Sequence, residues 1–167
     1  MKSSSIAIAA TVALAAGATM HATDARAAIS ATTPVGACLG SSPASEANLR
    51  ERPLGVRNEG ATAVFVSCAA QWGYNPYQVI DASIVVTNAN AQAVDVACTL
   101  VDGVLDTVAY FPKTVSIAAN GTGKMVWRYS DYGNTSFSGF ENFSCNLPPG
   151  VEINFVGFGY ESHPFGN

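Results

Sequence analysis

The chain has 167 residues, a formal net charge of −4 and only 12% charged residues. Lys and Arg form no cluster that could neutralise phosphate groups, so we expect no nucleic-acid partner. A chain of this length corresponds to one domain with a sizeable core of its own.

The N-terminus has the pattern of a secretory signal peptide. Lys2 precedes an apolar run over 6–18, and an A-x-A site ends at Ala27. The run is shorter than the ~20 residues that a bilayer-spanning helix needs. We therefore expect cleavage after Ala27, with Ala18 and Ala22 as alternative positions. The mature chain would be secreted or periplasmic, with no membrane span.

Four cysteines follow the leader, and an even number in an exported chain predicts two disulfides with three connectivities. We expect the pairs Cys38–Cys68 and Cys98–Cys145. The first would tie an N-terminal segment to a strand, and the second would join two strands whose cysteines share a face with core residues. The chain has no C-x-x-C pair, and His163 is the only histidine after the leader. A zinc site is therefore disfavoured, and we expect no metal or other cofactor.

Residues 28–60 are rich in Ser, Ala, Gly and Pro and lack apolar periodicity. They predict an irregular arm, with a single helical turn within 41–50 capped by Ser45. Residues 61–167 would form the sandwich, and the arm would join it in one mature domain.

The first strand is expected over 61–68, and a hairpin is expected over 81–102. Apolar residues alternate with polar ones over 82–87 and again over 94–100. This period of two is typical of strands that bury one face. Asn88 and Asn90 lie between the two runs and suit a turn, so the two strands are expected to pair antiparallel.

Five further strands are expected after this hairpin. Segments 107–111 and 114–118 would be separate strands interrupted at Pro112, and the Asn120-Gly121 turn would join 114–118 to 123–129 in a second hairpin. Alternation resumes over 143–147, and a last strand begins at 151.

About eight short strands without a helical run of any length predict an all-β fold, namely an antiparallel sandwich or jelly roll. An immunoglobulin domain is disfavoured, because neither Trp72 nor Trp127 lies at the required place between two cysteines. No internal repeat is evident.

The sequence offers little for catalysis. A lone His163 and the absence of G-x-S-x-G argue against a serine hydrolase. Asp131 and Glu141 could form the carboxylate pair of a glycosidase, which is the weakest alternative. With Asn134 they could also hold calcium, but the D-x-D-x-D-G spacing is missing. We expect no enzyme.

Two polar loops, 71–77 and 130–142, carry aromatic residues, including Phe140 at the end of the second. Flat rings beside amides and carboxylates are typical of a sugar-binding surface, because rings stack on the apolar face of a pyranose. The alternative is that the rings close the ends of the sandwich as core. The expected function is binding of carbohydrate or another component of the cell envelope, and the expected ligand-binding residues are Trp72, Tyr74, Tyr77, Asp131, Tyr132, Asn134 and Phe137. A structural or protein-interaction domain that pairs with an envelope protein through a sheet edge is the second hypothesis.

Overall fold

The computed structural model describes residues 27–32, 34–69, 78–133, 137–138 and 140–161. The expected signal peptide lies outside these ranges up to residue 26. The described elements, in chain order, are β1 (Ala27–Thr32), β2 (Cys38–Gly40), α1 (Pro43–Glu46), β3 (Leu49–Arg52), β4 (Gly55–Asn58), β5 (Val64–Ala69), β6 (Gln78–Asn88), β7 (Val94–Asp102), β8 (Ala109–Ile117), β9 (Thr122–Arg128), the 3₁₀ turn η1 (Tyr129–Tyr132), β10 (Glu141–Leu147) and β11 (Val151–Glu161). No helix in the described ranges is long and apolar enough to cross a membrane.

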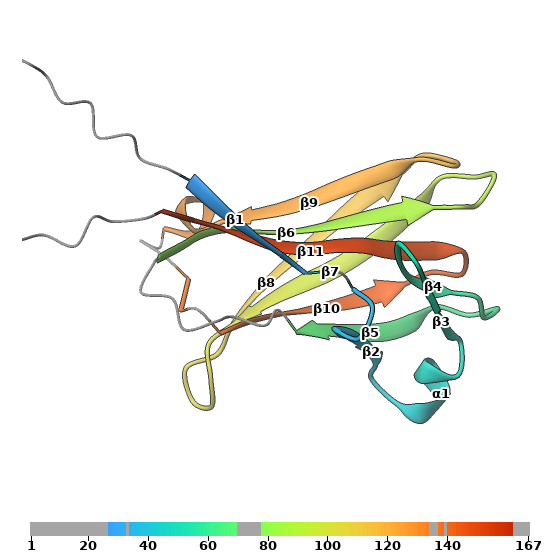
Figure 1. Ribbon diagram of the computed structural model, residues 1–167, viewed down its shortest axis with the longest axis horizontal. Coiled ribbons are helices and arrows are strands. Elements are labelled where there is room, and N and C mark those ends of the chain that lie inside the picture. The colour runs from blue at the N-terminus through green and yellow to red at the C-terminus, as the bar shows by residue number, and fades with distance from the viewer. Residues whose placement is uncertain (1–26, 33, 70–77, 134–136, 139, 162–167) are drawn as a thin grey trace, which may run out of the picture.

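The strands form two antiparallel sheets packed face to face (Figure 1). One is six-stranded, with the order β3-β4-β11-β6-β9 and with β1 also paired to β11. The other is five-stranded, with the order β2-β5-β10-β7-β8. From β4 to β11 the chain crosses between the sheets at every connection except the one from β7 to β8, which is the jelly-roll order and confirms the predicted fold class.

The core lies between the sheets and is built by alternation along each strand. In β5, Val64, Val66 and Cys68 are buried while Phe65 is exposed. In β9, Trp127 is fully buried and its indole Nε1 donates a hydrogen bond of 2.7 Å to the carbonyl of Phe111 on the other sheet. Burying one large apolar side chain stabilises the fold by about 1.5–3 kcal/mol, so the period of two dictates which face turns inward.

Both predicted disulfides are confirmed, and both lie in the five-stranded sheet. Cys38 pairs across the ladder with Cys68, and Cys98 pairs with Cys145. The four sulfur-bearing side chains are buried on the inner side of this sheet. The bridges therefore fix the registers of β2 to β5 and of β7 to β10.

The hairpin predicted over 81–102 is wrong. Strand β6 pairs with β9 and β11, whereas β7 pairs with β8 and β10 in the opposite sheet. The residues between them form a corner that crosses the sandwich. Alternation shows that a strand buries one face, but it does not show which strand is the hydrogen-bonding partner.

The second predicted hairpin is wrong for the same reason, because β8 pairs with β7 while β9 pairs with β6. The turn itself is present, with Asn120 at a φ of +53°. The predicted interruption at Pro112 is also wrong, since β8 is continuous from Ala109 to Ile117. Proline is tolerated there because β8 is an edge strand, where the missing N–H need not serve a neighbour.

The structure reveals an internal repeat that the sequence analysis missed. Asn58 to Cys68 and Asn88 to Cys98 share the pattern N-x-x-A-x-A-V-x-V-x-C, and both segments form a corner followed by a strand of the five-stranded sheet. Each asparagine is fully buried. Its Oδ1 accepts a hydrogen bond of 2.9 Å from the backbone N–H two residues later, at Gly60 or Asn90. Its Nδ2 donates to the carbonyl four residues later, so one motif builds two equivalent corners.

Residues 28–60, expected to be an irregular arm, contribute β1 to β4 to the sheets. Their strands are short or partly charged, which hides the apolar period. The expected helical turn is present as α1, but its cap is Ser42, whose Oγ accepts a hydrogen bond of 3.1 Å from the N–H of Ser45. Ser45 itself lies inside the turn.

Candidate functional site

The two ends of the sandwich differ in their connections (Figure 1). Four corners cross between the sheets at the end that carries the buried asparagines. The opposite end holds η1, residues 137–138 and 140, and the β7–β8 loop 103–108, and we call it the aromatic end. Ala69, which precedes the first predicted loop, pairs with Asn142, and Val79, which follows it, bridges to Phe137. The described residues that flank both predicted loops therefore lie at this end, whereas Trp72, Tyr74, Tyr77 and Asn134 lie outside the described residues.

Phe137 and Tyr132 pack on one ring of the core. The ring centroid of Phe111 is 4.3 Å from that of Tyr132 and 5.7 Å from that of Phe137. Phe137 is only 4% exposed and belongs to the core, whereas Tyr132 is partly buried. Burial, and secondarily the neighbouring carboxylate of Asp131, raises the pKa of the Tyr132 phenol. The phenol therefore stays neutral and can donate a hydrogen bond at any ordinary pH.

The two carboxylates considered for catalysis do not share an environment. Asp131 is exposed in η1, whereas Glu141 is 1% exposed at the start of β10. Within the described ranges, no group of three or more His, Cys, Asp and Glu side chains is arranged to hold a metal ion.

Asp102 positions the second loop, and the sequence analysis missed it. Its Oδ1 accepts a hydrogen bond of 2.8 Å from the N–H of Ser138 and another from the Ser138 hydroxyl. The N–H of Gly103 donates a hydrogen bond of 3.2 Å to the carbonyl of Phe140. These contacts hold the Phe140 backbone beside β7 while leaving its ring 60% exposed. The signal for this role in the sequence was an aspartate at the end of an alternating apolar strand.

The outer side of the five-stranded sheet is the second feature that the sequence analysis missed. Its side chains alternate with the core along every strand, and among them Asp95 alone is charged. We call this surface the neutral face. It consists of Leu39, Phe65, Ser67, Ala69, Asp95, Ala97, Thr99, Val101, Tyr110, Pro112, Thr114, Ser116, Asn142, Ser144 and Asn146.

Two exposed rings lie at the aromatic end of the sandwich, beside the neutral face. Tyr110, which is 68% exposed, pairs through Val101 with Asn142. Phe140 lies two residues before Asn142. The two rings are therefore carried two strands apart, which corresponds to about 10 Å across the sheet. Between them the surface is made of Val101 and Asn142.

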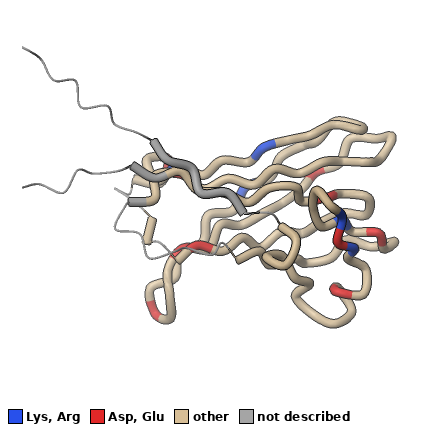
Figure 2. Tube along the Cα trace, in the orientation of Figure 1, with Lys and Arg blue, Asp and Glu red and all other residues tan. Residues whose placement is uncertain are grey.

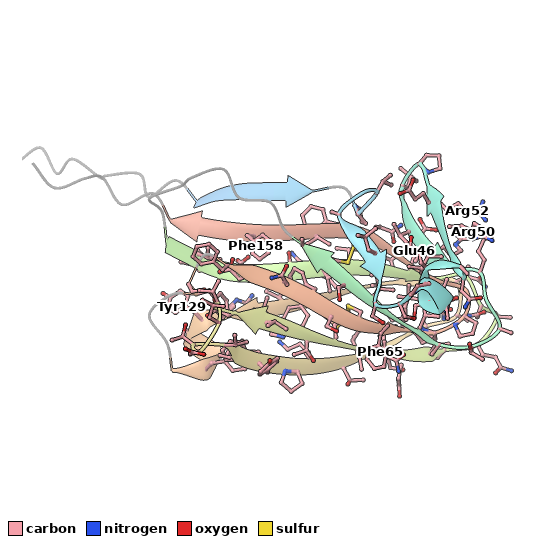
Figure 3. All side chains as sticks on the ribbon, turned by 90° about the horizontal axis from the view of Figure 1, so that it is seen from below. Glu46, Arg50, Arg52, Phe65, Tyr129 and Phe158 are labelled. Carbon is pink, nitrogen blue, oxygen red and sulfur yellow. A yellow bond between two sulfur atoms is a disulfide. The ribbon has the colours of Figure 1, made fainter. Side chains whose placement is uncertain are left out.

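The outer side of the six-stranded sheet has a different chemistry. Arg57 Nε donates a hydrogen bond of 2.8 Å to Glu152, and Asp81, Lys124 and Arg128 also lie on this side. We call it the charged face. Figure 2 shows charged residues gathered at the β3–β4 end, and Figure 3 shows Arg50 and Arg52 there, opposite Tyr129 at the aromatic end.

A shallow pocket of about 450 Å³ lies at the corner end, away from the exposed rings. The side chain of Asn90 is already used there, because its Nδ2 donates 2.8 Å to the carbonyl of Pro149 and 2.9 Å to Asn88. The pocket has no aromatic residue in its lining, which is Asn90, Ala91, Gln92, Ala93, Val94, Pro148 and Pro149.

No protein-family model matches the chain, and no curated protein matches it. Among solved structures, it is similar to a Podospora anserina GH26-CBM35 β-(1,4)-mannanase, with a TM-score of 0.36 and 13% identity over 84% of this chain and 29% of that one. It is also similar to TmCBM61, solved in complex with β-1,4-galactotriose, with a TM-score of 0.33 and 12% identity over 81% of this chain and 88% of that one. The chain thus spans less than a third of the mannanase. Similarities this low do not establish a family.

Proposed function

We propose that this protein is an exported, non-catalytic module that binds neutral carbohydrate at the aromatic end of the neutral face. The observation that carries the proposal is a pair of exposed rings at the aromatic end: Tyr110 lies on the neutral face, and Phe140 lies two residues before the exposed amide of that face, Asn142. Isolated exposed rings are common, but two close together beside a surface with no Lys or Arg form a platform.

The chemistry of this platform suits a sugar. A pyranose has an apolar face that stacks on a ring and equatorial hydroxyls that need donors and acceptors at the edge. Tyr110 and Phe140 would supply the rings, and the Asn142 amide would supply both a donor and an acceptor. Asp131 and Tyr132 stay in the proposal as polar groups at its rim, together with Trp72, Tyr74, Tyr77 and Asn134 on the sequence argument alone. Phe137 would support the platform from the core.

The disulfides support the proposed export. Two bridges persist in an oxidising compartment, so the mature chain is proposed to act in the periplasm or outside the cell. Cleavage after Ala27 would leave most of β1 in place on β11.

Affinity electrophoresis tests the proposal with soluble glucan, mannan, xylan and galactan. We expect retention of the mature protein by at least one polymer, and we expect Tyr110→Ala and Phe140→Ala each to weaken it about tenfold, because each removes a stacking ring. Leu54→Ala is the matched control. Leu54 is 77% exposed in the β3–β4 turn at the other end, so its loss should change neither retention nor melting temperature.

Retention by none of the four polymers, with the protein folded and both bridges formed, would overturn the proposal. Equal retention of both ring variants and of the wild type would do the same. Cross-linking that recovers one stoichiometric protein in place of a glycan would instead favour the interaction-domain hypothesis.

A further inference from the structure

The neutral face continues well beyond the aromatic end. Phe65 in β5 is 56% exposed, and it shares a row with Asn146, Ala97 and Thr114 through the strand registers. Asn146 lies six residues beyond Phe140 along the chain. At about 3.4 Å per residue, Phe65 and Phe140 mark points roughly 20 Å apart along the sheet.

Small polar side chains fill the space between these rings. Ser144 lies at the centre, opposite Thr99 on one side and Ser67 on the other. Within the described residues, the side chains of Ser67, Thr99, Asn142, Ser144 and Asn146 make no hydrogen bond to the protein. Their hydroxyls and amides offer donors and acceptors along the whole surface.

On the charged face, by contrast, several polar groups form hydrogen bonds within the protein. Thr87 and Thr122 bond each other at 3.1 Å, Asn154 donates 2.8 Å to Glu152, and the N–H of Gly159 donates 3.1 Å to Asp81. Within the described residues, these polar groups of the charged face bond within the protein, whereas the five side chains named above on the neutral face do not.

The neutral face has no Lys or Arg, and its one charged residue is Asp95, which limits what can bind there. A sulfated or uronic-acid polymer would need cations, and the neutral face has none among its residues. A stable protein interface has large apolar or Arg anchors at its centre, whereas the centre here is Ser144, Thr99 and Ala97. Pairing along the edge is disfavoured as well. Pro112 lacks an N–H, and Lys113, which points inward over Trp127, donates to the carbonyl of Val126 in β9.

We infer that a linear, neutral polysaccharide lies along the neutral face, stacking on Phe65 at one end and on Tyr110 and Phe140 at the other. The inference rests on the proposed function and extends it. The module would recognise an internal stretch several sugars long and not the end of a chain, because the stacking rings are spread over roughly 20 Å of the surface.

Isothermal titration with β-1,4-linked gluco-, manno-, xylo- and galacto-oligosaccharides tests the inference, using the series to which the parent polymer is retained. We expect affinity to rise at least tenfold from the disaccharide to the hexasaccharide. Phe65→Ala should weaken the hexasaccharide about fivefold and leave the disaccharide unchanged. Leu54→Ala is again the matched control, and the melting temperature of each variant reports its folding.

Equal affinity for the disaccharide and the hexasaccharide would overturn the inference, as would a hexasaccharide that binds Phe65→Ala and wild type alike. In both cases, loss of binding in Tyr110→Ala would leave the proposed function standing. Stronger binding to polygalacturonate than to every neutral polymer would also overturn it. So would a dimer, seen by analytical ultracentrifugation, that Ser144→Arg dissociates, because a second copy would then be the occupant.

Discussion

The two outer faces of this sandwich share the same strand geometry but use their polar side chains differently. On the charged face, Arg57 pairs with Glu152 and Thr87 with Thr122, so the polar groups stabilise the protein. On the neutral face, Ser144 and its neighbours have no such bonds among the described residues. The neutral face also lies on the sheet that holds both disulfides. A rigid sheet with unused polar groups is suited to binding, since little ordering is needed when a ligand arrives.

The largest expected effect comes from removing a disulfide of the five-stranded sheet. Replacing Cys98 and Cys145 by Ala should lower the free energy of unfolding by about 4 kcal/mol, because the bridge closes a loop of 47 residues. Chemical denaturation measures the loss. The comparison variant Arg57→Leu, on the charged face, should cost about 2 kcal/mol, the worth of a hydrogen bond to a charged group. A larger loss in Arg57→Leu would contradict the view that the five-stranded sheet is the rigid one.

The corners that join the two sheets should give the next largest effect. Asn88→Ala removes donor bonds of 2.8, 3.0 and 3.2 Å to the carbonyls of Gln92, Ala118 and Ile117. We expect a loss of about 3 kcal/mol, against about 2 kcal/mol for Asn58→Ala, whose Nδ2 makes two bonds. Denaturant titration of both variants measures these losses of unfolding free energy. Equal or reversed losses would contradict the view that the loss depends on the number of hydrogen bonds that each asparagine donates.

A charge placed on each face sharpens the functional contrast. Ser144→Arg puts a bulky cation at the centre of the neutral face and should weaken polysaccharide retention at least tenfold, or about 1.4 kcal/mol. Thr87→Arg makes the same change on the charged face and should leave retention unaltered. Both variants should keep the wild-type melting temperature to within a few degrees. If retention falls equally in both, the neutral face is not the site.

The smallest expected effect concerns Tyr132. Its folded-state pKa is raised above 10.0, chiefly by burial. The phenol of the unfolded chain ionises at a lower pH than the phenol of the folded protein. The contribution of Tyr132 to the free energy of unfolding is therefore fully present below pH 10.0 and is lost as the pH rises through the folded-state pKa. Melting temperatures of wild type and Tyr132→Phe between about pH 8 and pH 11 measure it. The wild type should fall more steeply, and parallel curves would count against burial as the cause.

Strands were readable from the sequence because burial leaves a period of two, as in Val64, Val66 and Cys68. Their partners were not readable. Two alternating runs joined by Asn88 and Asn90 look alike whether the chain turns within a sheet or crosses to the other one. The repeat of Asn58 to Cys68 in Asn88 to Cys98 was visible, and it would have predicted two equivalent corners.

The site was readable only in part. A phenylalanine in a polar loop can turn inward or outward, and Phe137 turns inward while Phe140 turns outward, because Asp102 and Val79 fix the backbone between them. Tyr110 and Phe65 were overlooked because each is one ring in one strand. They become neighbours on a surface only when the registers are known.

The most direct test is an amide chemical-shift titration of the mature protein with the hexasaccharide that binds best. The account predicts shifts concentrated in β5, β10, β7 and β8, reaching from Phe65 through Ser144 to Tyr110. Shifts confined to the charged face around Arg57, or to the corner pocket around Gln92, would contradict it.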